Sequence, residues 1–298
     1  MEQQSATFQV PNGTLTFDVT GNGPVLVCLP GWPFNRQTYR NLIPHLSKHY
    51  TCINIDTLGL GESTWNAQTD FSIPSQAQAI VQLLQHLNVK AFRILAFNSA
   101  GVIARYIAAE KTDGVQQLLL MNTDIPGQRP PWLPLYRFLF SLPGGRHLLN
   151  NPIAKHFVLP SPLMLGLAFE DLQQIDPDFY HLILRPMLTD SRCFKGLGLY
   201  MKGFSYELMD RFTVPGGVHE KIKAPTHLIW GENDPTFPLS HARSMTKTLP
   251  AFKSLDVIPG ARLLVHEEKP EAVLERLQAR LAEIPHSDLQ NSTDTAAA

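Results

Sequence analysis

The sequence predicts an α/β fold, a doubly wound and mostly parallel sheet with an inserted helical cap. Short unbroken apolar runs, typical of strands buried on both faces, alternate with amphipathic helical stretches. This alternation stops after residue 126, where proline and glycine separate short helical patches, and it resumes at residue 212. We therefore expect a core made of residues 1–126 and 212–284 and a cap made of residues 127–211.

The composition limits the class of protein and its partners. The 298 residues suit one large domain with an insertion, and 44% hydrophobic residues can fill a sizeable core. A formal net charge of −1 provides no basic face, so we expect neither nucleic acid nor anionic lipid as a partner. No apolar run approaches the roughly 18 residues that span a bilayer. Residues 1–5 lack the features of a secretory signal, which predicts a cytoplasmic location. The sequence indicates no particular oligomeric state.

The three cysteines predict packing residues rather than a metal site. Cys28, Cys52 and Cys193 have no metal-like spacing, and an odd number in a chain without a secretory signal indicates reduced thiols. Cys28 and Cys52 also fall in strand-like runs, where a thiol behaves as a small apolar side chain. We expect neither a metal ion nor a cofactor.

The strands are predicted from apolar runs and turn signals. The first two form a hairpin around Asn12-Gly13, with strands at residues 6–10 and 14–19. The others are the apolar runs at residues 25–29, 51–55, 92–96, 117–121, 226–230 and 254–257. Because ligands bind at the carboxyl ends of such parallel strands, the loops that follow them are the places to look for a site.

The helices are predicted from apolar residues at helical spacing. Ser72 caps one of them, with Pro74 in its first turn. The helical patterns of the core lie at residues 39–46, 77–87, 240–248 and 270–281. Those of the cap lie at residues 134–142, 145–150, 163–169, 178–188 and 193–209. The polar tail at residues 285–298 is expected to be disordered.

The turn after the strand at residues 92–96 is the most informative stretch of the chain. A sharp turn from strand to helix presents one side chain at the top of the sheet, and it needs small residues two positions before and after that side chain. Centred on Asn98, these positions are Ala96 and Ala100. Centred on Ser99, the first position would be Phe97, which is too large. The sequence therefore places Asn98 at the apex, and Ser99 as an alternative apex is opposed by Phe97.

Four motifs in the same order resemble the α/β-hydrolase fold family over residues 14–281. Residues 29–33 (Leu-Pro-Gly-Trp-Pro) are similar to its oxyanion loop, and residues 56–63 (Asp-Thr-Leu-Gly-Leu-Gly-Glu-Ser) to its Asp-x-x-Gly-x-Gly-x-Ser segment. Residues 230–235 look like its acid loop, and residues 266–271 like the start of its final helix. The helical cap and residues 122–126 place the chain nearest the haloalkane dehalogenase and epoxide hydrolase branch. The resemblance implies hydrolysis of an ester, an epoxide or a carbon–halogen bond.

The resemblance also assigns the catalytic positions, and two of them carry unsuitable residues. Asn98 stands at the nucleophile position, where the family has Ser, Asp or Cys. Aligning residues 267–270 with the family pattern puts Leu263 at the histidine position, and leucine cannot accept a proton. Asp234 falls at the acid position, although an aspartate that caps a turn would also fit, and Asp124 is the weaker candidate for the acid. His266, the only histidine nearby, is expected either to act as a displaced base or to lie on the surface.

Three explanations of Asn98 remain open. Asparagine tolerates the positive φ that such a turn requires. Its amide could instead bind a ligand by hydrogen bonds, or Asn98 followed by Ser99 could deamidate to an aspartate. The oxyanion donors implied by the resemblance are the backbone N–H groups of Trp32 and Ser99, and we expect them to be intact.

Most aromatic side chains of the cap are expected to form its own core. The few that face the sheet, Trp132 and Tyr136 among them, are expected to line an apolar ligand pocket. If the chemistry were epoxide opening, the acid would be one of the cap tyrosines Tyr136, Tyr180, Tyr200 and Tyr206. Ser99 argues against dehalogenation, because that branch usually has Trp beside its nucleophile.

The sequence thus predicts a protein that acts on a small apolar molecule, with triad hydrolysis weak or absent. Altered chemistry on the same fold, as in a slow hydrolase or in a lyase or cyclase that uses only the oxyanion donors, is one form of this prediction. The alternative is a ligand-binding protein without catalysis.

Overall fold

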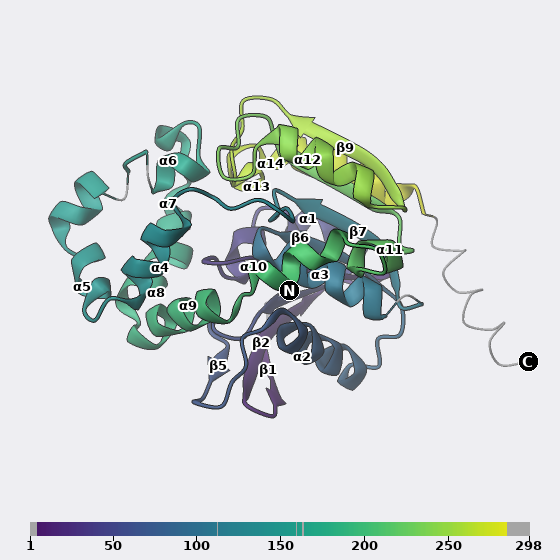
Figure 1. Ribbon diagram of the computed structural model, residues 1–298, viewed down its shortest axis with the longest axis horizontal. Helices are drawn as coiled ribbons and strands as arrows, with labels where there is room; N and C mark the ends of the chain where they lie inside the picture. The colour runs from purple at the N-terminus through teal and green to yellow at the C-terminus, as the bar shows by residue number, and fades with distance from the viewer. Residues whose placement is uncertain (1–4, 112, 159, 163, 285–298) are drawn as a thin grey trace, which may run out of the picture.

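A nine-stranded sheet forms the centre of the protein in a computed structural model that describes residues 5–284 except 112, 159 and 163 (Figure 1). The strands run in the order β1-β2-β4-β3-β6-β7-β8-β9, and β5 pairs with β2. Their bounds are β1 Ser5–Val10, β2 Gly13–Thr20, β3 Val25–Leu29, β4 Thr51–Asp56, β5 Thr64–Trp65, β6 Phe92–Phe97, β7 Val115–Met121, β8 Thr226–Gly231 and β9 Phe252–Ile258. The tail predicted at residues 285–298 lies outside the described residues.

The pairing confirms the predicted sheet. Strands β3, β4, β6, β7, β8 and β9 are parallel, whereas β1, β2 and β5 form an antiparallel edge. The hairpin of β1 and β2 closes with Val10 opposite Gly13, around the predicted turn. Every residue of β6 and of β8 is buried, as expected for strands covered on both faces. Only the two-residue strand β5 has no counterpart in the prediction.

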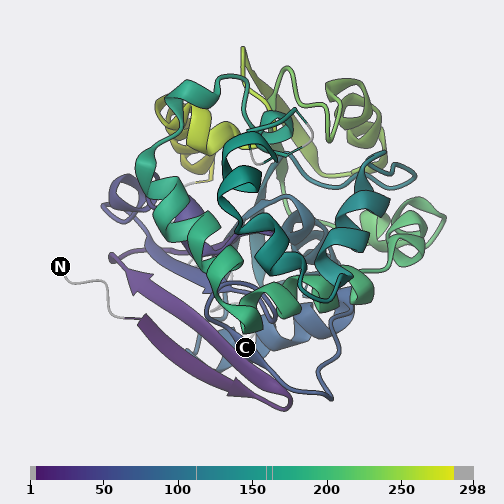
Figure 2. The same cartoon turned by 90° about the vertical axis from the view of Figure 1, so that its left-hand side faces the viewer.

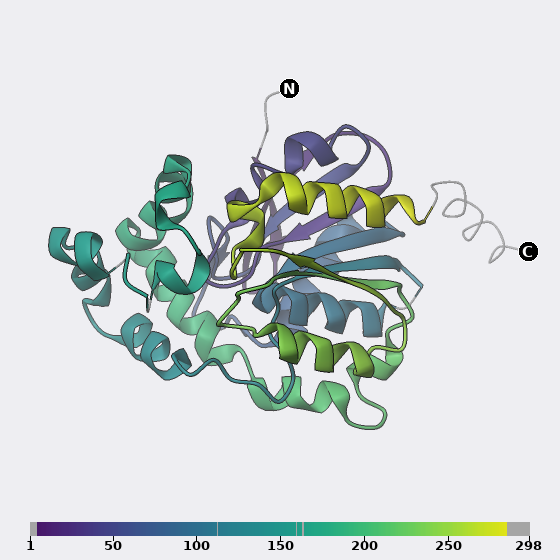
Figure 3. The same cartoon turned by 90° about the horizontal axis from the view of Figure 1, so that it is seen from above.

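Helices cover both faces of the sheet (Figure 3). One face carries α1 (Ile43–Leu46) and α14 (Pro270–Ala282), and the other carries α2 (Ile73–His86), α3 (Ser99–Glu110) and α12 (Leu239–Met245). Ser72 caps α2 by accepting a hydrogen bond from the backbone nitrogen of Ser75, as predicted.

The predicted helix at residues 39–46 differs from the observed structure. A 3₁₀ turn, η1 (Arg36–Tyr39), is followed by the separate helix α1. Pro44 lies in the first turn of α1. Because proline lacks an N–H and favours the first turn of a helix, it starts a new helix instead of continuing the preceding one.

The helices from α4 to α10, which follow β7 and are called the helical insertion below, lie at one end of the sheet (Figures 1 and 2). No strand occurs among the described residues between β7 and β8, as predicted. The predicted helices at residues 178–188 and 193–209 are each divided, the second because Ser205 caps a new helix. The helices between β7 and β8 are α4 Leu133–Ser141, α5 Gly145–Leu149, η2 Ala154–Val158, α6 Leu165–Ala168, η3 Leu172–Gln174, α7 Pro177–Phe179, η4 Tyr180–Leu184, α8 Arg185–Thr189, α9 Ser191–Gly203, α10 Tyr206–Asp210, η5 Arg211–Thr213 and α11 Val218–Lys221. Of these, α11 packs on α3. The remaining helical segments are η6 (Thr246–Thr248) and α13 (Val265–Glu268).

The buried cysteines confirm the predicted role in packing. Cys28 and Cys52 are fully buried in the apolar core, and all three cysteines are free thiols. In the described part of the chain, no helix is long and apolar enough to cross a membrane.

Candidate functional site

The turn between β6 and α3 has the conformation that the sequence predicts. Asn98 has φ 54° and ψ −135°, a conformation that asparagine tolerates better than most residues with a Cβ. Ala96 and Ala100 are fully buried on either side of it. The loop after β3 approaches so closely that a Cβ on Gly31 would lie 2.4 Å from the backbone oxygen of Phe97. Small residues therefore allow this turn and the loop to touch.

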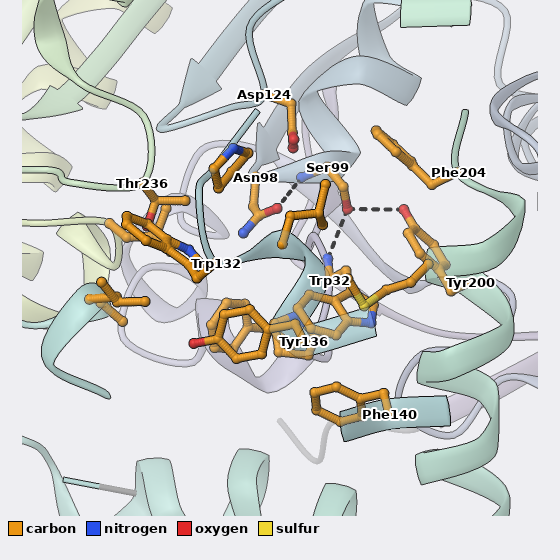
Figure 4. A pocket seen from close by; sticks show the side chains of 18 of the residues that line it. Trp32, Asn98, Ser99, Asp124, Trp132, Tyr136, Phe140, Tyr200, Phe204 and Thr236 are labelled. Carbon is orange, nitrogen blue, oxygen red and sulfur yellow. Dashed lines mark hydrogen bonds between the residues drawn. The ribbon is translucent and has the colours of Figure 1, made fainter. Parts of the chain in front are cut away.

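A pocket of about 140 Å³ lies between this turn and the helical insertion (Figure 4). Loops at the carboxyl ends of the strands contribute Trp32, Asn98, Ser99, Asp124 and Leu263. The insertion contributes mainly aromatic and aliphatic side chains, including Trp132, Tyr136, Phe140, Tyr200, Phe204 and Tyr206. A cavity of about 150 Å³ with apolar walls can hold one benzene molecule, so this pocket suits a small apolar ligand.

The two expected oxyanion donors are already occupied. The backbone nitrogen of Trp32 donates to the Oγ of Ser99 at 2.9 Å. The backbone nitrogen of Ser99 donates to the Oδ1 of Asn98 at 2.5 Å, and the same Oγ lies 3.0 Å from the hydroxyl of Tyr200 (Figure 4). Side chains of the chain itself therefore accept hydrogen bonds from both backbone nitrogens that the sequence predicts as oxyanion donors.

Leu263, the residue that the alignment assigns to the histidine position, lies at the pocket. Its side chain lines the pocket that Asn98 also lines. The preceding residue, Arg262, is held by an ion pair with Glu170 at 2.7 Å. The pocket therefore presents only hydrocarbon at this position.

His266 is neither on the surface nor in the pocket. It is fully buried, so the expectation of a surface residue is wrong. Its Nε2 lies 2.8 Å from the Oγ1 of Thr38, and its ring packs against Phe97 and Tyr39. Burial lowers the pKa of His266 to about 3. The helix α13 points this ring into the core, which is why nearness in sequence to Leu263 does not bring it to the pocket.

Asp234 is buried in a turn beside the pocket. Its Oδ1 accepts hydrogen bonds from the backbone nitrogens of Thr236 (2.7 Å) and Phe237 (3.1 Å). Its Oδ2 accepts one from the side chain of Asn122 at 2.7 Å. Burial raises the pKa of Asp234 to about 7, and these three donors act in the opposite direction. Asn122 was not singled out from the sequence; the signal for it was its position directly after β7.

Asp124 lies in the pocket itself and is 3% exposed. The hydroxyl of Tyr206 donates to its Oδ1 at 3.0 Å. Burial raises the pKa of Asp124 to about 6, against the effects of Tyr206 and the buried Arg105.

Three of the four cap tyrosines that the sequence suggests as acids lie at the pocket. Tyr136, Tyr200 and Tyr206 line the pocket, and the described lining does not include Tyr180. Over the described residues, no group of three or more His, Cys, Asp or Glu side chains could hold a metal ion.

The sheet order, the turn at Asn98 and the insertion after β7 together define an α/β-hydrolase fold. Residues 24–270 match the family described as alpha/beta hydrolase fold, and the chain belongs to that family, as its motifs predict.

Relatives and solved structures agree with this assignment. The soluble epoxide hydrolase of Corynebacterium sp. (strain C12) is 34% identical over 107 residues, which are 36% of this chain and 37% of that protein. Haloalkane dehalogenase 2 of Mycobacterium tuberculosis (strain ATCC 25618 / H37Rv) is 23% identical over 283 residues, 92% of this chain and 94% of that protein. The structure of epoxide hydrolase CorEH without ligand superposes with a TM-score of 0.75 and 19% identity over 95% of this chain and 100% of that chain. The family chemistry of these relatives is hydrolytic.

Proposed function

We propose that this protein binds a small apolar molecule in the pocket beside Asn98 and does not hydrolyse it. The observation that carries the proposal is the hydrogen bond from the Trp32 backbone to Ser99, which fills the place of an oxyanion. Two further groups that hydrolysis needs are missing from their positions. The amide of Asn98 is a very poor nucleophile, and Leu263 cannot act as a base.

The rate enhancements that the absent catalytic groups would supply are large, which favours binding over catalysis. General-base catalysis alone contributes roughly a hundred- to ten-thousand-fold to a rate. The nucleophile and the base act as a unit, so losing both leaves only what binding and the oxyanion donors supply. Here the donors are filled as well. The pocket, in contrast, keeps its apolar walls.

The first test compares turnover of esters, epoxides and haloalkanes, the substrate classes of the family. The wild type is measured beside Asn98→Asp, Leu263→His and the double variant that carries both changes. We expect no turnover by the wild type and measurable turnover only by the double variant. With an epoxide or a haloalkane, the carboxylate of Asn98→Asp attacks carbon and opens the ring or releases halide, and the reaction should stop at the covalent ester because no base activates water. Intact-protein mass spectrometry would detect that ester.

The second test measures binding directly. A saturable rise of the unfolding temperature with toluene, without any chemical change in the compound, is expected for a binding protein. Turnover of any of the three substrate classes by the wild type would overturn the proposal. In that case, the residue responsible would have to be sought again among the polar groups that line the pocket, beginning with Ser99 and Asp124.

A further inference from the structure

One charged side chain stands in an otherwise neutral pocket. Among the described residues that line it, Asp124 is the only one that carries a formal charge at neutral pH. The remainder are aromatic, aliphatic or neutral polar side chains. Burying a charge without a partner is costly. Asp124 is the weaker candidate for the triad acid, but with Leu263 at the histidine position a triad acid has no histidine to orient, so the position of Asp124 requires another explanation.

The carboxylate of Asp124 is only partly satisfied by the protein. Its Oδ1 accepts from Tyr206, while within the described chain its Oδ2 accepts no hydrogen bond from another residue. A carboxylate has about four acceptor sites on its two oxygens. The described residues also place no Lys, Arg or His nitrogen within ion-pairing distance of it. Acceptor capacity therefore remains in a pocket that otherwise offers little charge.

The nearest buried cation does not use that capacity. Arg105 is fully buried and donates from Nη2 to the backbone oxygen of Asp124, and its Nη1 lies 3.0 Å from the Nε2 of His219. Burial lowers the pKa of Arg105 to about 10, so it stays cationic at neutral pH. Its charge helps to keep Asp124 ionised, yet its hydrogen bond goes to the backbone oxygen of Asp124 and not to the carboxylate.

The surroundings of Asp124 suit a cation on an apolar body. Figure 4 shows Asp124 beside Asn98 and Ser99, and the aromatic side chains of Trp132 and Phe204 also line the pocket. Aromatic faces attract ammonium groups, most strongly where water is excluded. We propose that the ligand of this pocket is a small hydrophobic amine whose ammonium group binds to the carboxylate of Asp124. This inference rests on the proposed binding function and specifies the class of its ligand.

The test uses four one-ring compounds of similar size that differ in their polar group: toluene, benzyl alcohol, benzylamine and benzoate. Their affinities for the wild-type protein are measured by calorimetry at pH 7.5. Benzylamine is expected to bind about tenfold more tightly than toluene, because a hydrogen bond to a charged group is stronger than a neutral one. Benzyl alcohol should fall between them, and benzoate should bind most weakly, because it places a second carboxylate near the first.

Two variants separate the role of Asp124 from a general effect of charge. Asp124→Asn should remove the preference for benzylamine, so that benzylamine and toluene bind with similar affinity. Glu207→Gln, which removes a negative charge from the exposed surface of α10, should keep the preference. If Asp124→Asn does not fold, the order of the four compounds on the wild type still decides the question.

The outcomes distinguish the two proposals. Toluene that binds as well as benzylamine would overturn the amine inference and leave the binding function standing. Retention of the preference in Asp124→Asn would also overturn it. If none of the four compounds binds, both proposals fail, whereas hydrolysis of a test ester by the wild type contradicts only the proposed function.

Discussion

The Oγ of Ser99 lies 2.9 Å from the backbone nitrogen of Trp32 and accepts its hydrogen bond. In an active α/β-hydrolase this nitrogen would be expected to face the oxygen of the substrate, because it belongs to the oxyanion loop. Here a side chain next to the apex of the turn occupies that place. The hydroxyl of Tyr200, from the helical insertion, lies 3.0 Å from the same oxygen and fixes it from the other side.

Removing this side chain should make a donor available again. In the background of Asn98→Asp with Leu263→His, the further change Ser99→Ala frees the Trp32 nitrogen. We expect an increase in kcat on a small epoxide of at least about tenfold, because the freed nitrogen can stabilise the oxyanion that forms when water attacks the covalent ester at position 98. One oxyanion donor is worth roughly a hundred- to a thousandfold. Turnover by the triple variant is compared with that of the double variant, and Ser244→Ala on the exposed side of α12 is the control. Equal rates for the triple and double variants would show that Ser99 does not block the site.

The two cap tyrosines should contribute unequally to stability. Tyr206→Phe removes the one hydroxyl that donates to the buried Asp124, and a hydrogen bond to a charged group contributes about 2 kcal/mol. Tyr200→Phe removes a neutral contact, and the Oγ of Ser99 keeps its bond with Trp32, so the expected loss is about 1 kcal/mol. Urea unfolding of both variants measures the difference. A loss for Tyr200→Phe as large as that for Tyr206→Phe would contradict it.

His266 should make the protein less stable in mild acid. Burial lowers its pKa in the folded state to about 3, whereas the unfolded chain has the ordinary value of about 6.5. Below pH 6.5 the unfolded state binds a proton that the folded state does not, so the free energy of unfolding falls as the pH falls. Between pH 7 and pH 5 this effect amounts to about 2 kcal/mol.

The substitution His266→Gln isolates this effect. Glutamine can still bond to Thr38, so the variant should lose about 2 kcal/mol less than the wild type between pH 7 and pH 5. Urea unfolding at the two pH values gives the comparison. The exposed His45 supplies the control His45→Gln, which should follow the wild type. If His266→Gln and the wild type lost the same unfolding free energy between pH 7 and pH 5, His266 would have to be protonated in the folded protein.

Gly31 should be intolerant of any side chain. A Cβ there would lie 2.6 Å from the Cβ of Asn98 and 2.7 Å from the backbone nitrogen of Ser99. Gly31→Ala must therefore push the loop away from the turn, at a cost of about 1–3 kcal/mol for overpacking. Thermal unfolding measures the loss, with Gly114→Ala as the control, because a Cβ at Gly114 would meet no atom of the described residues closer than 3.1 Å. A stable Gly31→Ala variant would show that the loop and the turn are not rigidly packed.

The sequence by itself determined the fold, the family and the residue at the apex of the turn. Apolar runs and small residues act on the backbone close to where they stand, so the spacing of Ala96 and Ala100 was enough to place Asn98. The motif at residues 267–270 likewise placed Leu263, which the structure puts in the pocket.

Only the tertiary structure decided which groups of the site are available. Ser99 and Tyr200 are separated by 101 residues, and Asp124 and Tyr206 by 82, so these contacts depend on how the helical insertion packs over the sheet. The burial of His266 depends in the same way on the direction in which α13 points its ring. Local patterns specify the course of the backbone, whereas the filling of a donor or the isolation of a carboxylate depends on side chains that meet across elements distant in sequence.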